Sequence, residues 1–196
     1  MRNPDVTRET ILQKSGILFN THGYKATSIS HITDATGFTK GAIYRHFTNK
    51  DELEIQTLTH LSAVMFEKLR SKIKAENTAG KKLRALFKYF ESYISSPPLK
   101  GGCPLLNVAI EADDANPALR KAALKMLHEM RQSIISMLSK GIKYKQLKPT
   151  IDKELFATMI IASLEGAIMM SKLSGLEDDI KTVVKFLDRY LGEYEL

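Results

Sequence analysis

Apolar residues recur at helical spacing along most of the chain, and no stretch alternates apolar and polar residues as a half-buried strand would. The 6 prolines and 11 glycines mostly fall between the helical segments. We therefore expect an all-α fold. The pattern predicts helices over about residues 7–22, 27–37, 39–47, 51–75, 79–94, 105–112, 117–144, 152–173 and 178–190.

Several of these segments begin at residues that can cap a helix. Thr39 and Asn49 stand at predicted starts, where a side-chain oxygen can accept a hydrogen bond from the first free N–H groups. Glu52 follows Asn49 at the spacing of a capping box. Asn116, followed by proline, is a strong start signal for a long helix.

The stretch 155–171 carries a single charge, Glu165. A membrane span needs about 20 apolar residues, and this stretch is shorter, interrupted near its middle, and rich in small residues. We interpret it as a helix that is buried nearly all round, in part against a second subunit.

The composition is that of an ordinary soluble globular protein, with 43% apolar and 26% charged residues in a chain of 196. Cys103 is the sole cysteine, so no internal disulfide can form, and a reducing compartment is expected. The first residues lack the apolar run of a signal peptide, which makes the cytoplasm the expected location.

The basic residues are concentrated near the N-terminus. Of the net charge of +7, residues 1–50 carry +4, with seven Lys and Arg against three Asp and Glu. This distribution favours a polyanion-binding head on a nearly neutral body. From charge alone, an ordinary solvated basic surface explains it equally well.

Two short helices joined by a glycine-containing turn within residues 27–47 have the spacing of a helix-turn-helix, in which the second helix enters the major groove of DNA. Thr27 and Ser28 open one helix, and Thr39 and Lys40 open the next, so hydroxyl, amide and ammonium donors are available for phosphates. Gly41 lets the backbone approach DNA closely. The alternative is an ordinary three-helix packing unit with exposed polar residues.

Over about residues 7–60 the chain resembles the N-terminal domain of the TetR family of bacterial transcriptional regulators. The resemblance rests on the runs Lys40-Gly41-Ala42-Ile43-Tyr44-Arg45-His46-Phe47 and Lys50-Asp51-Glu52-Leu53. It implies a DNA-binding domain over 1–50 and an effector-binding and dimerisation domain over 51–196, with 51–75 as a connecting helix. It also implies a homodimer through helices at about 152–174 and 178–190.

Matching positions imply which residues meet DNA. Arg45 is the choice for base readout, because arginine can bond both acceptors of a guanine, worth roughly 1–3 kcal/mol of discrimination. Phosphate contacts are expected from Thr27, Ser28, Lys40, Tyr44, His46 and Lys50, and approach to base edges from Thr39, Gly41, Ala42 and Arg45.

Methionine and aromatic residues at helical spacing in the body suggest an effector pocket, although such stripes are more often plain core. Cys103 is a candidate thiol sensor, but we favour the interpretation that it is a small buried residue in a glycine-rich turn. Its surroundings, residues 101–113, are similar to a motif in one branch of the family. The candidate ligand-binding residues are Phe87, Phe90, Cys103, Asn107, Met126, Met130, Phe156, Met159, Glu165 and Met169.

We therefore expect a ligand-responsive repressor that binds a palindromic DNA operator as a homodimer and is released by a small-molecule effector. No cofactor or metal is expected. The sequence contains no glycine-rich phosphate loop, metal-ligand cluster or nucleophile elbow, which argues against an enzyme. The alternative is a helical interaction module that binds polyanions without sequence specificity.

Overall fold

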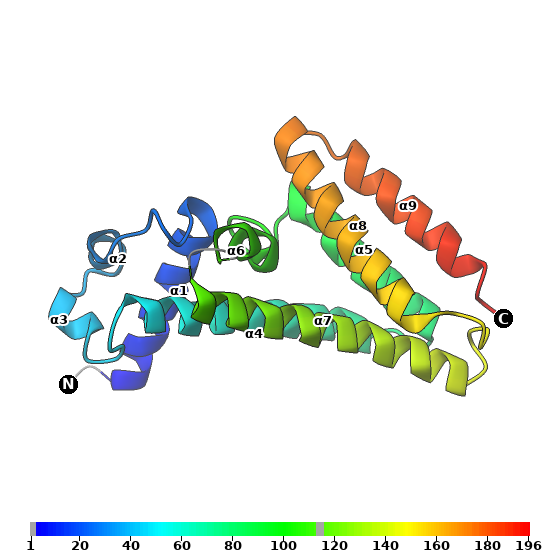
Figure 1. Ribbon diagram of the computed structural model, residues 1–196, viewed down its shortest axis with the longest axis horizontal. Coiled ribbons are helices and arrows are strands. Elements are labelled where there is room, and N and C mark those ends of the chain that lie inside the picture. The colour runs from blue at the N-terminus through cyan, green and yellow to red at the C-terminus, as the bar shows by residue number, and fades with distance from the viewer. Residues whose placement is uncertain (1–2, 113–115) are drawn as a thin grey trace. The chain divides into compact units, whose positions relative to one another are not determined.

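The computed structural model describes residues 3–112 and 116–196. Residue 113, the last residue of the segment 101–113 that is similar to a family motif, lies outside the described residues. Within these ranges every regular element is a helix, which confirms the expected all-α fold (Figure 1). The helices are α1 (Pro4–His22), α2 (Ile29–Thr36), α3 (Lys40–Ile43), α4 (Lys50–Lys74), α5 (Ala79–Ser95), α6 (Pro104–Ala112), α7 (Pro117–Lys143), α8 (Lys153–Ser174) and α9 (Asp178–Gly192).

The chain forms two compact units. The first unit comprises Met1–Met65 and Leu99–Met126, and the second comprises Phe66–Pro98 and Leu127–Leu196. Both α4 and α7 contribute one end to each unit. The expected functional division at residue 50 stays a prediction.

Most predicted boundaries agree with the structure, and two differ for local reasons. Helix α1 begins at Pro4, earlier than predicted, because the Asn3 side chain accepts a hydrogen bond from the Asp5 N–H at 2.9 Å. Helix α3 ends at Ile43 rather than near residue 47, since residues 44–46 form turns.

The capping box expected at Asn49 is only half present. The Asn49 side chain accepts from the Glu52 N–H at 2.8 Å, but the Glu52 carboxylate accepts from the N–H and the hydroxyl of Thr48, each at 2.6 Å. A full capping box occurs instead between Ser28 and His31, at the start of α2.

The first unit packs α2 against α1 and α3, with α6 against α1. Ile32 of α2 and Ile43 of α3 are fully buried, as is Phe19 of α1. The Phe19 ring stacks on Tyr24 with centroids 4.8 Å apart. These apolar contacts hold the two short helices, which could not form alone in water.

In the second unit, α8 packs against α9 and both contact α5; Figure 1 shows α8 and α9 running antiparallel. Phe156 of α8 stacks on Tyr190 with ring centroids 5.1 Å apart. Arg84 of α5 pairs with Asp188 at 2.5 Å and with Glu195 at 2.7 Å. The hydrogen bonds that Arg84 donates to Glu195 are the main reason that the pKa of Arg84 is raised.

Candidate nucleic-acid interface and effector site

Helix α2 and the turn after it are fixed by local hydrogen bonds. The Ser28 hydroxyl accepts from the His31 N–H at 3.2 Å, and His31 Nδ1 accepts from the Ser28 N–H at 3.2 Å. Gly37 ends the helix with φ at 70°, in the left-handed region that only glycine adopts without strain. The turn therefore sets the direction in which α3 leaves α2.

Helix α3 buries one side and exposes the other. Its start is capped by the Thr39 hydroxyl, which accepts from the Ala42 N–H at 3.2 Å. Ile43 lies in the core, whereas Lys40 is exposed, as is Arg45 on the turn that follows the helix. The exposed side of α3 is thus basic and polar, as a surface that binds polyanions requires.

Gly41 lies on this exposed side and has no packing neighbour that demands glycine. A Cβ atom added there would lie 4.0 Å from Thr39 Oγ1. Apart from the adjacent residues and the backbone of its own helix, no other heavy atom is closer. Nothing within the chain therefore requires the absence of a side chain at this position.

Tyr44 and His46 lie beyond the end of α3, on the turns that follow it. The Tyr44 side chain is partly exposed, and Lys40 Nζ lies 5.9 Å from its ring centroid. His46 is half-buried, with its ring 6.4 Å from that of the buried Phe47. An ammonium group over an aromatic face is attracted by the ring quadrupole, so Tyr44 helps to orient Lys40.

Two of the expected phosphate contacts are engaged inside the protein. Thr27 is 0% exposed, and its hydroxyl donates to the Gly23 carbonyl at 2.7 Å. Lys50 Nζ donates to the Tyr24 carbonyl at 2.8 Å and pairs with Glu54 at 3.1 Å. Thr27 and Lys50 therefore hold the chain in place before α2 and after α3, the two helices expected to meet DNA.

Glu54 lies at the centre of a buried polar group. Glu54 is 5% exposed, and its Oε2 atom accepts a hydrogen bond from the Asn116 side-chain amide at 3.2 Å. Burial raises the pKa of Glu54, and the ion pair with Lys50 opposes that shift. Burial is also the main reason that the pKa of Tyr24 is raised, with Glu54 and Glu111 adding to it.

Sequence reasoning missed the part that α6 plays in the first unit. The Glu111 carboxylate accepts from the backbone N–H groups of Tyr24 and Lys25, at 3.1 and 3.0 Å. Gly23 leaves room for this carboxylate, because a Cβ there would lie 2.7 Å from Glu111 Oε1. No local pattern signals this contact, since the partners are 86 and 87 residues apart.

One turn before Glu111, α6 makes a second set of contacts. Asn107 donates to the side-chain oxygen of Asn20 at 2.9 Å and to its carbonyl at 3.0 Å. Asn20 in turn donates to the carbonyls of Lys100 and Gly102, at 2.8 and 2.9 Å. Gly101 is required beside them, because a Cβ there would lie 2.3 Å from the Asn20 carbonyl oxygen.

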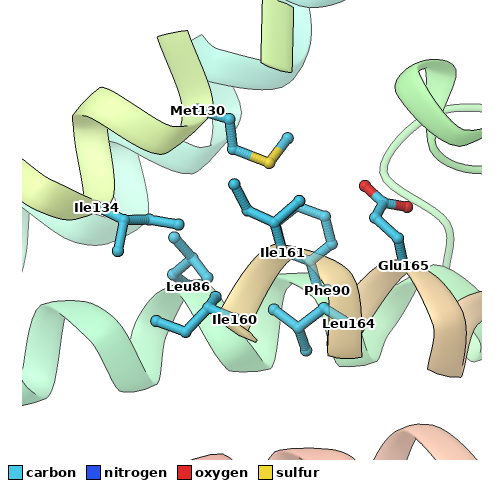
Figure 2. Close-up of a pocket in the computed structure, with 8 residues that line it drawn as sticks. All are labelled: Leu86, Phe90, Met130, Ile134, Ile160, Ile161, Leu164 and Glu165. Carbon is cyan, nitrogen blue, oxygen red and sulfur yellow. The ribbon is translucent and has the colours of Figure 1, made fainter. Parts of the chain in front are cut away.

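An apolar space in the second unit brings together three of the candidate ligand residues, Phe90, Met130 and Glu165 (Figure 2). Side chains fill the space so closely that no water-sized sphere fits. The other lining residues are Leu86, Ile134, Ile160, Ile161 and Leu164, all apolar, so the Glu165 carboxylate is the one charged group on its wall among the described residues.

Comparison with known proteins identifies the chain. Residues 79–187 match the family described as tetracyclin repressor-like, C-terminal domain, and residues 11–55 match bacterial regulatory proteins of the tetR family. The chain belongs to the TetR family. It is therefore a DNA-binding transcriptional regulator and not an enzyme, as the sequence predicted.

Individual TetR-family relatives resemble it over nearly their full length. The crystal structure of a TetR transcriptional regulator from Chloroflexus aurantiacus J-10-FL is 34% identical, covers 100% of this chain and 98% of its own, and has a TM-score of 0.94. The HTH-type transcriptional repressor DhaR of a Mycobacterium species is 25% identical and covers 85% of this chain and 82% of its own. The cysteine mutant of the TetR regulator CifR, solved with 26-bp operator DNA, shares the fold at 21% identity, with coverage of 92% and 94% and a TM-score of 0.83.

The remaining candidate ligand residues of this TetR regulator lie elsewhere. Met159 and Met169 are exposed on α8, and Phe87 and Phe156 are buried but do not line the space at Glu165. Cys103, Asn107 and Met126 belong to the first unit, where Cys103 is fully buried. Their part in ligand binding stays a prediction.

Helix α8 is less enclosed than the pattern suggested. By length and composition it is apolar enough to cross a membrane, and half of its apolar stretch is buried, as is common for a core helix of a soluble protein. TetR regulators are soluble DNA-binding proteins. Exposed apolar side chains on α8 and α9 are Leu155, Met159, Met169, Met170, Leu173 and Phe186, with Leu176 between the helices.

Proposed function

We propose that this TetR-family regulator acts in the cytoplasm as a repressor that binds a palindromic operator as a homodimer and leaves it when a small effector binds the second unit. The observation that carries the proposal is the exposed side of α3. Lys40 lies on this side, Arg45 is exposed on the turn that follows the helix, and Ile43 holds the other side in a buried core. Family membership supports operator binding as its use.

The recognition surface divides into phosphate and base contacts. We propose that Lys40, Ser28 and Tyr44 bind phosphates, because their polar groups are at the surface. His46 is half-buried and adds a donor beside them. Arg45 reads a base edge in the major groove.

Thr39, Gly41 and Ala42 let α3 come close to the base edges. The open space around Gly41 supports this role, since only an external partner would penalise a side chain there. Lys50 reaches a phosphate by exchanging its bond to the Tyr24 carbonyl, and Thr27 acts from the interior by holding the turn before α2.

The exposed apolar side chains of α8 and α9 support a homodimer. More than half of the large apolar side chains that are exposed on the described chain lie between residues 155 and 186. A patch of this kind on a soluble protein marks an interface. A twofold dimer would present two recognition helices to successive major grooves, about 34–36 Å apart.

The space at Glu165 supports a mostly apolar effector. Met130 is flexible and can move to admit a ligand, and the Glu165 carboxylate can orient a donor group on it. Effector binding would favour a subunit arrangement that no longer fits the operator, with a coupling of about 1–3 kcal/mol per ligand.

Selection of bound fragments from random duplex DNA, followed by sequencing, tests operator binding. We expect a palindromic consensus with one half-site per subunit, together with a dimeric mass by light scattering. Equal recovery of unrelated duplexes would instead favour a module that binds polyanions without sequence preference. A monomer in solution would contradict the dimer.

A further inference from the structure

A second hollow in the second unit is lined by basic and polar side chains. It lies between the C-terminal half of α4 and the last turns of α5, and its volume is about 330 Å³. Small-molecule sites begin at about 300 Å³. Unlike the closed space at Glu165, this hollow is open and has room for a small metabolite.

The charge around this hollow is strongly positive. Residues 66–74 of α4 carry four Lys and Arg against one Glu. Lys68 and Lys72 line the hollow from the same side of α4, one turn apart. Among the described residues, no carboxylate lines it. Two ammonium groups without a counter-ion on the wall attract an anion.

One of these lysines is held in place. Lys68 Nζ donates to the carbonyl of Pro98 at 2.5 Å, on the segment that follows α5. An ammonium group has three N–H donors, so two remain for a ligand. Because its position is fixed, less side-chain entropy is lost when an anion binds.

Two of the three serine side chains that line the hollow, Ser71 and Ser92, offer hydrogen-bond acceptors. Ser71 Oγ donates to the Lys68 carbonyl at 2.8 Å, and Ser92 Oγ donates to the Tyr89 carbonyl at 2.7 Å. Each hydroxyl has a single hydrogen, so what each offers a ligand is a lone pair that accepts. A ligand that uses them must carry O–H or N–H donors.

We propose that this hollow binds a small anion that also carries hydroxyl groups, the chemistry shared by phosphorylated polyols and hydroxycarboxylic acids. Lys68 and Lys72 bind the anionic group, Ser71 and Ser92 accept from ligand hydroxyls, and the Tyr89 ring forms part of the wall. The site shares no residue with the operator surface or with the space at Glu165, and it goes beyond the proposed function.

Calorimetric titration of the full chain without DNA, at low ionic strength, tests the site with four probes. We expect saturable binding of glycerol 3-phosphate at millimolar concentration or below, weaker binding of methyl phosphate, which lacks hydroxyls, and none of neutral glycerol. Tartrate shows whether a carboxylate can replace the phosphate. Failure of both hydroxylated anions, glycerol 3-phosphate and tartrate, to saturate, or binding of glycerol equal to theirs, would overturn the proposal.

Two variants locate the binding. Lys72→Gln should weaken glycerol 3-phosphate about fivefold, the loss expected for one exposed ionic contact. Ser92→Ala should lower its affinity towards that of methyl phosphate, with the remaining difference due to Ser71, while leaving methyl phosphate unchanged. Lys140→Gln, an exposed lysine of α7, is the matched control and should change nothing.

An unchanged affinity in Lys72→Gln would mean that the anion binds elsewhere on the basic surface and would overturn the assignment. Melting curves check that each variant is folded. Since the titrations contain no DNA, failure here leaves operator binding untouched, and failure of operator binding leaves this result untouched.

Discussion

Each compact unit has an apolar core, but the contacts that supplement this core differ between the two units. In the first unit, Asn107 of α6 donates hydrogen bonds to Asn20 of α1, and the Glu111 carboxylate of α6 accepts from backbone N–H groups of the turn before α2. In the second unit, aromatic rings pack on one another, as in the cluster in which Phe156, Tyr190 and Tyr194 contact one another, and the ion pairs of Arg84 join α5 to the C-terminal segment. Directional bonds fix the orientation of short helices, whereas apolar packing supplies most of the stability.

This contrast suits two different tasks. A surface that reads DNA needs defined angles between short elements, which hydrogen bonds to backbone groups provide. A unit that admits a ligand needs side chains that can move, and methionine and branched aliphatic residues can repack at little cost. Five variants test how far this difference holds.

The largest expected effect is on the core of the second unit. Phe156→Ala should lower the free energy of unfolding by about 3–5 kcal/mol, because it removes a ring that is 2% exposed and stacked on Tyr190. Urea unfolding followed by circular dichroism measures the loss. A loss below about 1 kcal/mol would mean that the aromatic cluster contributes far less than its burial implies.

In the first unit, the corresponding variant is Glu111→Gln. It replaces two charge-assisted hydrogen bonds to the N–H groups of Tyr24 and Lys25, so we expect a loss of about 1–2 kcal/mol. Amide hydrogen exchange at residues 24 and 25 should quicken more than exchange in α8. If exchange at those amides is unchanged, the polar contact does not hold the turn.

Gly41→Ala separates folding from DNA binding. The structure has room for the methyl group, and alanine favours a helix by about 0.5–1 kcal/mol over glycine, so stability should be kept or slightly raised. Operator affinity should fall about tenfold, equivalent to about 1.4 kcal/mol, if DNA lies against this backbone.

Gly192→Ala in α9, also with open space around it, is the matched control for Gly41→Ala and should leave operator binding unchanged. Electrophoretic mobility shifts with the selected operator measure both variants. Equal operator affinities for Gly41→Ala and the parent protein would place α3 away from the groove.

A smaller effect is expected when one phosphate contact is removed. Lys40→Ala should weaken operator binding and reduce the slope of log affinity against log salt concentration by about one unit. The exposed Lys140 of the second unit provides the control, since its replacement by alanine should leave the slope intact. An unchanged slope in Lys40→Ala would remove Lys40 from the phosphate contacts.

The smallest effect concerns the pH dependence of stability. Burial raises the pKa of Glu54 in the folded state, so the folded chain binds its proton more tightly than the unfolded chain does. The resulting stability is fully present below the unfolded pKa of about 4.3 and is lost as pH rises through the folded pKa.

Glu54→Gln should remove this fall in stability with rising pH. Urea midpoints for the parent and the variant, measured from acid to neutral pH, give the difference between the two curves. Parallel curves would show that the Glu54 carboxyl titrates alike in the folded and unfolded chains.

Local features of the fold could be predicted from the sequence, because they depend on neighbours along the chain. Asn116 caps α7 through the Leu119 N–H at 3.0 Å, and Asp152 caps α8 through the Leu155 N–H at 3.0 Å, at the predicted starts. The exposure of Lys40 and Arg45 beside the buried Ile43 likewise follows from helical spacing.

Contacts between distant segments could not be predicted in this way. Nothing near Glu111 in the sequence indicates that it binds the backbone at Tyr24. The apolar stripes of α5, α7 and α8 show which residues face inward, but not that Phe90, Met130 and Glu165 meet while Phe156 packs elsewhere. That selection depends on how the helices cross.

The chain of hydrogen bonds from Asn107 to Asn20, and from Asn20 to the loop before α6, constrains how this chain can diverge in sequence. Loss of Asn107 removes the donor to the Asn20 side-chain oxygen, and loss of Asn20 removes the donor to the carbonyls of Lys100 and Gly102. A buried polar group that loses its partner costs about 1–3 kcal/mol. Single replacements should therefore be selected against, and the two positions should change together, in exchanges that keep a donor for the loop carbonyls, among descendants of this chain.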